Sequence, residues 1–267
     1  MLFKTVLLLA SSLTASVMGA ALQGHNECGT PEPTEEQKQI AQQMLLNETM
    51  LRIAGVAPGP DVNIPVYVHI VAIDKTTKGG WANEEDVRTT IAEMNQHYKG
   101  MGFQFTLKEI DYTINKDWAM SKGEIKMKTA LRRGDYKTLN IYYTPKMTSN
   151  GYSYYPEKVT PGSQKFYRDG CVVRTDIMRN KQTATHEVGH WLGLFHTFES
   201  GCEGGGDMVD DTPALKIGWD CDENLDTCPD LPGKDPVHNF LSYGDCRNVF
   251  TPGQGARMRS QYDLYRK

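Results

Sequence analysis

One short segment of the chain has the residue types and spacing of a metal site. Three of the seven histidines lie in His186-Glu187-Val188-Gly189-His190-Trp191-Leu192-Gly193-Leu194-Phe195-His196. His186 and His190 are four residues apart, so a helix would place both imidazoles on one face, where they can bind the same Zn²⁺. Gly193 can take a backbone conformation that ends the helix, which lets His196 return as a third ligand. Three protein ligands leave one position open, as in catalytic zinc sites.

Glu187 directly follows the first histidine, which is the place of the general base in the HExxH arrangement. We therefore predict hydrolysis by a zinc-activated water with Glu187 as the base. The extended pattern fixes five positions where a bare HExxH fixes three, so the alternative of three ordinary histidines on an amphipathic helix is weak. The other histidines have no ligand-like spacing, and we interpret His69 and His97 as ordinary core or surface residues.

Regular elements are predicted on both sides of the metal-binding segment, which itself is expected to be helical over 182–192. Val87, Ile91 and Met94 recur at the helical period after a capping Asn83. Two more helices are predicted, one after Thr34 to about residue 51 and one from Thr251-Pro252. Strands are predicted at 63–72, 103–107, 139–143 and 171–175. This order indicates an α+β domain with an α/β-like N-terminal half, divided by a cleft.

The N-terminus is typical of a secretory signal peptide. Residues 1–20 contain Lys4, an apolar stretch at 6–10 and small residues before Ala21, so we expect cleavage near residue 20 and a secreted protein. A buried N-terminal helix is the alternative. We expect 21–60 to be an N-terminal segment, which could be a pro-region, and 61–267 to be the catalytic domain. The stretch is too short to span a bilayer, and the formal net charge of −4 argues against nucleic-acid binding.

Six cysteines in an exported chain predict three disulfides, whose pairing the residues alone leave open. Four of them lie in 202–246, a region with little apolar periodicity that cross-links would stabilise. The run Asn47-Glu48-Thr49 is a sequon for N-glycosylation, and an unused sequon is the equal alternative.

The extended zinc motif is similar to that of the metzincin metalloendopeptidases. The wider set of motifs resembles the pappalysin family, most of all its secreted fungal extracellular metalloproteases. The set consists of residues 183–196, Asp210-Asp211-Thr212-Pro213, Asp235-Pro236-Val237-His238-Asn239-Phe240 and Phe250-Thr251-Pro252-Gly253-Gln254. The resemblance implies a metzincin fold, with a mixed five-stranded sheet and two long helices in an upper subdomain (about 61–193) over a smaller loop-rich one (about 194–267). It also implies protein or peptide substrates, and we expect a monomer.

One position departs from the metzincin pattern. Leu241 stands where the family carries the methionine of the Met-turn, and leucine and methionine have similar volume and polarity. We therefore expect a working site. The resemblance gives Tyr243 a role at the zinc or at the tetrahedral intermediate, and a plain core tyrosine is the alternative.

The resemblance also implies the disulfides Cys202–Cys228 and Cys221–Cys246, which leaves Cys28 with Cys171. We prefer that third disulfide to the competing interpretation. In the latter, the Cys28 thiolate binds zinc and holds the enzyme latent while Cys171 stays unpaired.

Two further features remain open. Asp207, Asp210, Asp211 and Thr212 offer hard oxygen ligands for Ca²⁺, and relatives bind calcium near here, but we prefer a solvated acidic loop. Residues 151–155 form either the sheet edge along which substrate lies or a buried aromatic strand.

The predicted function is a secreted zinc-dependent endopeptidase. The alternative is a catalytically silent, zinc-stabilised secreted binding protein. Leu241 is its only support, and the intact Glu187 argues against it.

Overall fold

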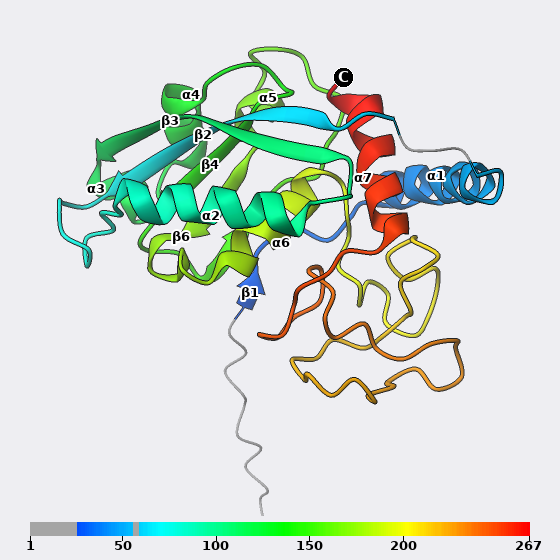
Figure 1. The fold of residues 1–267 in the computed structure, drawn as a ribbon. Helices are drawn as coiled ribbons and strands as arrows, with labels where there is room; N and C mark the ends of the chain where they lie inside the picture. Colours follow the sequence, from blue (N-terminus) through cyan, green and yellow to red (C-terminus); the bar gives the residue numbers. More distant parts are fainter. Residues whose placement is uncertain (1–25, 56–58) are drawn as a thin grey trace, which may run out of the picture.

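The computed structural model of the chain describes residues 26–55 and 59–267 (Figure 1). The predicted signal peptide at 1–20 lies outside these residues. Within the described part of the chain, no helix has the length and apolar character that crossing a membrane requires. Figure 1 shows the sheet and most helices on one side of the molecule and a region of irregular chain, drawn in yellow and orange, on the other.

A mixed, mostly parallel sheet forms the centre of the fold. Within residues 26–55 and 59–267 the sheet has six strands in the order β1-β5-β6-β4-β2-β3, of which only the pair β5 and β6 is antiparallel. Their bounds are β1 (Asn26–Cys28), β2 (Val62–Ala72), β3 (Phe103–Ile114), β4 (Leu139–Thr144), β5 (Ser149–Tyr152) and β6 (Cys171–Arg174). The prediction of five strands is wrong by one, because the N-terminal segment adds β1 to the edge of β5 through parallel pairing of Cys28 with Gly151.

Apolar residues on both faces of the sheet explain why it is covered on both sides. Ile64, Val66 and Val68 of β2 alternate toward the main core, which also contains residues of α2 and α6. Val71 of the same strand faces a second, smaller core with Met127 of α4. The sheet is therefore held between two layers, and the larger core lies on the side of α6.

Three helices, α1, α2 and α7, begin at the caps that the sequence predicts. The bounds of the helices are α1 (Glu35–Ile53), α2 (Glu84–His97), α3 (Lys116–Ala119), α4 (Glu124–Leu131), α5 (Gln164–Arg168), the 3₁₀ turn η1 (Thr175–Ile177), α6 (Lys181–Trp191) and α7 (Pro252–Tyr265). Thr34 and Thr251 each form a capping box with a glutamine three residues on, and the Asn83 side chain accepts from the backbone of Asp86.

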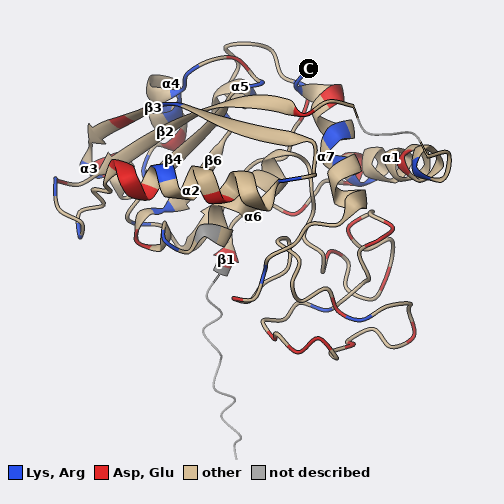
Figure 2. Cartoon of the chain, viewed as in Figure 1, with Lys and Arg blue, Asp and Glu red and all other residues tan. Residues whose placement is uncertain are grey.

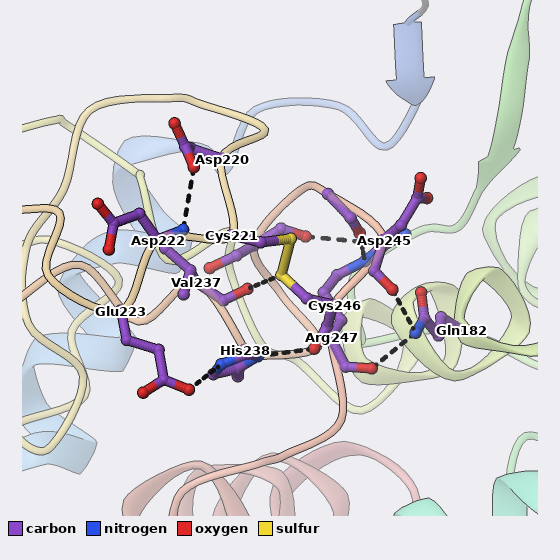
Figure 3. Close-up of a disulfide and its surroundings, with 12 residues drawn as sticks. Gln182, Asp220, Cys221, Asp222, Glu223, Val237, His238, Asp245, Cys246 and Arg247 are labelled. Carbon is purple, nitrogen blue, oxygen red and sulfur yellow. Dashed lines mark hydrogen bonds and ion pairs between the residues drawn. A yellow bond between two sulfur atoms is a disulfide. The ribbon is translucent and has the colours of Figure 1, made fainter.

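Residues 192–251 carry no helix or extended strand and are held together by two disulfides. Cys202 is bonded to Cys228 and Cys221 to Cys246, which are the pairings that the resemblance implied. Figure 3 shows the second disulfide beside α6. The expected Cys28–Cys171 disulfide is wrong, since both residues are buried free thiols. Cys28, the last residue of β1, lies beside His186, His190 and His196. Cys171 contacts the hydroxyl of Ser153 instead.

Helix α1 is fastened to the irregular region and to α7 by ion pairs. The guanidinium of Arg257, on α7, donates twice from Nε and once from Nη2 to the buried carboxylate of Glu48. Lys38 pairs with Glu199 at 3.1 Å, and Arg52 pairs with Asp210. Figure 2 shows acidic and basic residues interspersed over the described chain in this view. Since the pair of Glu48 and Arg257 is buried, α1 is packed as part of the folded domain.

We expect Glu48→Ala to destabilise the protein by about 3–5 kcal/mol, because it leaves the buried Arg257 without its counter-charge. Thermal or denaturant unfolding of the two proteins measures the difference. Arg88→Ala, which breaks an exposed pair with Glu84, is the control and should cost less than about 1 kcal/mol. Equal losses in both variants would contradict the account of α1.

Candidate metal centre and active site

Helix α6 and the bend that follows it bring three imidazoles together. His186 and His190 lie one turn apart, and their Nε2 atoms are 3.1 Å from each other. At the end of the helix Gly193 has φ of 95°, where a Cβ would lie 2.5 Å from Gln261 of α7. Only glycine fits this bend without strain. The bend returns His196, whose Nε2 lies 3.3 Å from that of His186 and 3.1 Å from that of His190.

Hydrogen bonds on the other ring nitrogens fix the orientation of two of these imidazoles. The Nδ1 of His186 donates to the carbonyl of Phe240 at 2.6 Å, and that of His190 donates to the carbonyl of Leu194 at 2.7 Å. The Nε2 lone pairs are thereby directed toward one point. Burial also lowers the pKa of His190 to about 4, so its imidazole is neutral and free to coordinate.

The donor set fits a tetrahedral zinc ion. Three nitrogens at about 2.0–2.1 Å from zinc would be separated by about 3.3 Å from one another. The observed separations of 3.1, 3.1 and 3.3 Å agree with this value. The fit depends on His186, His190 and His196 alone, as the sequence predicts.

A fourth donor comes from the N-terminal segment. The Sγ of Cys28 and one ring nitrogen of each histidine all lie within 4.8 Å of one another, and all four residues are buried. Among the described residues this is the one group of such side chains with metal-binding geometry. The pairing of β1 with β5 places this sulfur beside the histidines. This position favours the interpretation of Cys28 as a zinc ligand over the Cys28–Cys171 disulfide.

The carboxylate of Glu187 is buried beside the same sulfur. Its Oε2 lies 3.5 Å from the Sγ of Cys28 and accepts a hydrogen bond of 3.1 Å from the hydroxyl of Thr30. Burial raises the pKa of Glu187 to about 8. The sequence gives Thr30 no role of its own beside Cys28, because nothing in its spacing indicates that this segment would reach Glu187.

Two residues near the end of the irregular region, Leu241 and Tyr243, pack against the zinc helix and the histidines. The hydroxyl of Tyr243 lies 3.4 Å from Nε2 of His196, and both residues are buried. The side chain of Leu241 is fully buried against Gly189 of α6, where an added Cβ would lie 2.9 Å from it. Leu241 therefore supports the zinc helix by packing, which a side chain of this size can do without sulfur.

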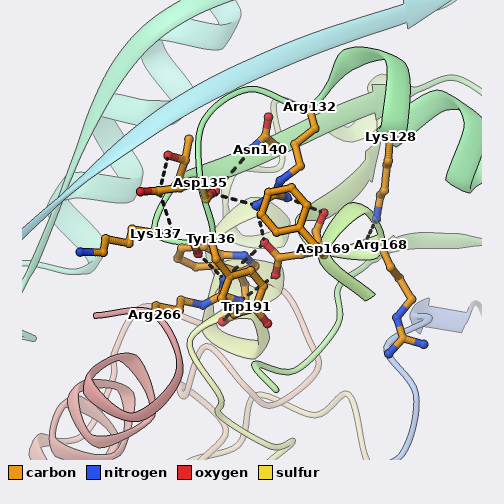
Figure 4. A network of polar contacts seen from close by, with 12 residues as sticks. Lys128, Arg132, Asp135, Tyr136, Lys137, Asn140, Arg168, Asp169, Trp191 and Arg266 are labelled. Atoms are coloured by element: carbon orange, nitrogen blue, oxygen red, sulfur yellow. Dashed lines mark hydrogen bonds and ion pairs between the residues drawn. The ribbon is translucent and has the colours of Figure 1, made fainter. Parts of the chain in front are cut away.

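A buried ionic cluster holds the far end of α6 (Figure 4). Arg266 donates to the carbonyl of Trp191 at 3.0 Å and covers its ring at 3.7 Å. The carboxylate of Asp169 pairs with Arg266 at 2.8 Å and with Arg132 at 3.2 Å. One carboxylate thus bridges two guanidiniums, and through Arg266 the cluster holds the last turn of the helix, which carries His190.

The acidic loop does not support the calcium prediction. The carboxylate of Asp210 is engaged by Arg52 and by the hydroxyl of Thr49. Asp207 accepts from Thr212 and from the backbone of Val209. Asp211, which has one ion-pair contact with Arg52, accepts from the backbone of Gly253 at 2.8 Å. Protein groups therefore satisfy much of this cluster, which differs from an open site for a hard cation.

Two other predicted features have clear positions. Asn47 is exposed on α1, and its glycosylation stays a prediction. The stretch 151–155 begins in β5, whose outer edge is covered by β1 in this structure, and its residues are buried or half-buried. The residues are thus packed as in the buried-strand interpretation, and binding of substrate along this strand stays a prediction.

Comparison with known proteins decides the family. The model of peptidase family M43, described as pregnancy-associated plasma protein-A, matches residues 129–263, which include the whole histidine site. The chain belongs to the pappalysin family. This pappalysin is 41% identical over 279 residues to an extracellular metalloprotease of Colletotrichum graminicola, covering 100% of this chain and 99% of the relative. It is 38% identical to one of Neurospora crassa, over 97% of this chain and 96% of the relative.

Solved structures confirm the fold. The pappalysin aligns with mirolysin in complex with compound 9, with a TM-score of 0.62 and 21% identity, over 77% of this chain and 93% of mirolysin. Mature mirolysin of Tannerella forsythia in complex with a cleaved peptide gives a TM-score of 0.60 at 22% identity, over 78% and 93%. The protein is thus a metallopeptidase with the mixed α+β metzincin fold.

Removal of a single imidazole should abolish tight zinc binding by this pappalysin in a Cys28→Ser background, since two nitrogens are then all that remains of the donor set. We expect His190→Ala in that background to lose zinc on equilibrium dialysis while Cys28→Ser alone retains about one ion per chain. His238→Ala, which changes a half-exposed histidine paired with Glu223, is the control and should retain it. Retention of zinc by His190→Ala would remove this residue from the site.

Proposed function

We propose that this metallopeptidase is a secreted, zinc-dependent endopeptidase that hydrolyses peptide bonds with Glu187 as general base. The observation that carries the proposal is the convergence of three Nε2 atoms at 3.1–3.3 Å beside a buried carboxylate. His186, His190 and His196 would hold the zinc ion, which would supply Lewis acidity for activation of water and polarisation of the scissile carbonyl. Secretion is supported by the relatives named extracellular and by two disulfides.

Glu187 is placed to move the proton. It accepts a proton from the attacking water at its free carboxylate oxygen and transfers it to the nitrogen of the leaving amine. The residue next to it in the sequence is a metal ligand, so the carboxylate lies at the edge of the metal site without belonging to the ligand set. Its burial keeps bulk water away from the transferred proton.

Tyr243 is proposed to stabilise the oxyanion that forms on the substrate. Its hydroxyl lies 3.4 Å from a ligand nitrogen, and burial and nearby carboxylates raise its pKa. The phenol is therefore protonated at neutral pH and can donate a hydrogen bond to developing negative charge.

We expect Glu187→Gln to retain zinc and lose activity by about 10²–10⁴-fold, because an amide has nearly the same shape but cannot accept the proton. Hydrolysis of casein with and without a chelator, together with metal analysis, measures both properties. An unchanged rate in Glu187→Gln would exclude Glu187 as the base. A metal-loaded wild type without hydrolysis would favour the silent binding protein.

We propose that the N-terminal segment around residues 26–30 keeps the full-length chain inactive. Cys28 offers its sulfur as the fourth ligand, Thr30 hydrogen-bonds the base, and β1 covers the edge of β5 along which a peptide would lie. Together these contacts occupy the open metal position, the base and the substrate strand. Since α1 is fastened by Glu48 and Arg257, the segment that must leave ends before α1, and α1 belongs to the catalytic domain.

We expect Cys28→Ser to raise the hydrolytic activity of the full-length chain by about tenfold or more, because serine is a weak zinc ligand at neutral pH. The comparison uses the rate of peptide hydrolysis before any N-terminal processing, which mass spectrometry verifies. Cys171→Ser changes the other free thiol and should leave the rate as it is in the wild type. Equal activity of wild type and Cys28→Ser would argue against latency through this sulfur.

A further inference from the structure

Arg247 places a buried positive charge at the cleft. Its side chain is 4% exposed, and its Nε and Nη1 donate to the carbonyls of Gly244 and Ser242 at 2.7 and 3.4 Å. These bonds hold the plane of the guanidinium, and they use two of its three nitrogens. The third, Nη2, is directed toward the N-terminal segment, where its partner is Glu27.

The backbone that carries this charge is firmly anchored (Figure 3). Gln182 of α6 donates to the carbonyls of Asp245 and Arg247 at 3.1 and 2.8 Å. The preceding residue, Cys246, is bonded to Cys221. The guanidinium is thus fixed relative to the helix that carries His186, and the Nη1 atom lies 3.4 Å from the Nδ1 of that ligand.

The carboxylate that faces Arg247 belongs to the segment proposed to leave. Oε2 of Glu27 lies 3.6 Å from Nη2 of Arg247, and Glu27 directly precedes Cys28, which offers the fourth donor of the metal centre. Glu27 and Cys28 also line a hollow of about 460 Å³ whose other walls include His196, Trp219 and Tyr243. The carboxylate of Glu27 therefore lies one residue along the chain from the sulfur that faces the metal-binding histidines.

Other charges do not replace Glu27. Among the described residues, Arg247 makes no second ion pair. Asp245 is exposed, so solvent screens its charge. Glu187 also attracts Arg247 electrostatically, but no ion pair joins the two. A guanidinium this deeply placed favours a carboxylate in direct contact, and departure of the segment removes Glu27, its one ion-pair partner among the described residues.

We propose that Arg247 is a specificity-determining residue that selects an aspartate or glutamate next to the scissile bond of the substrate. This inference rests on the proposed peptidase function. In the full-length chain Glu27 then takes the place of the substrate's acidic side chain, because its carboxylate pairs with the guanidinium of Arg247. The planar, fixed guanidinium suits recognition of a carboxylate better than a mobile lysine would.

The first experiment measures kcat and KM of the active protein on peptides that differ only at the residues flanking the cleaved bond. With Glu in the position served by Arg247, we expect kcat/KM to exceed that with Gln by about tenfold or more, mainly through KM, and to fall as salt is added. Arg247→Gln should abolish the preference, and Arg88→Gln, an exposed arginine far from the metal ligands in sequence, should retain it. Cleavage without an acidic preference, or a preference that survives in Arg247→Gln, would overturn the proposal.

The second experiment has a readout other than turnover. In the full-length chain we measure the rate at which iodoacetamide alkylates Cys28, with Cys171 followed in the same sample as an internal reference for global opening. Glu27→Gln and Arg247→Gln should each accelerate alkylation of Cys28, and the double variant should add little to either, as expected for two groups that act as one pair. Glu32→Gln, which changes another acid of the same hollow, should not accelerate it.

The two experiments separate the possible failures. If no peptide is cleaved by any variant, the proposed peptidase function fails, while the alkylation rates still decide whether Arg247 binds a carboxylate. If Glu27→Gln leaves the rate at Cys28 unchanged, or the effects of the two variants simply add, Arg247 does not hold a carboxylate here and the proposal is overturned.

Discussion

Everything at the active site depends on three imidazole nitrogens being held close together with their lone pairs directed at one point. Nitrogens 3.1–3.3 Å apart gain nothing from one another, so the surrounding protein must hold them until a cation occupies the centre. Backbone carbonyls of Phe240 and Leu194 orient two rings, and the bend at Gly193 brings the third. Packing of Leu241 from below and the Asp169 cluster from behind keep the helix from relaxing.

The N-terminal segment uses the same features that a substrate would need. It adds a strand to β5, brings a sulfur to the metal donors, and contacts both Glu187 and Arg247. One short stretch therefore contacts the proposed base Glu187, the histidine cluster and the buried Arg247 at once. The proposed role of Cys28 at the metal agrees with its being a free thiol in this structure, since a disulfide would engage its sulfur.

The sequence predicts the parts of this arrangement that depend on local spacing. The interval between His186 and His190 predicts a shared helix face, and Thr34, Asn83 and Thr251 predict where helices begin, because capping is a local interaction. The zinc motif and the family resemblance together were enough for the fold class.

What the sequence could not predict depends on contacts between distant segments. The sixth strand arises because β1 pairs with β5, more than 120 residues away, and this pairing also decides the fate of Cys28. Thr30 and Arg247 carry no signal in their own spacing, since their roles come from where the sheet edge and the disulfide-anchored loop place them. Likewise, the acidic loop resembles a calcium site in composition, and only the structure shows that Arg52 engages it.

X-ray absorption at the zinc edge of the purified full-length protein tests the central claim most directly. The account predicts one zinc per chain, bound by three nitrogens at about 2.0–2.1 Å and one sulfur at about 2.3 Å. A protein that is metal-free when purified without chelators, or a zinc ion with fewer than three nitrogen ligands, would contradict it.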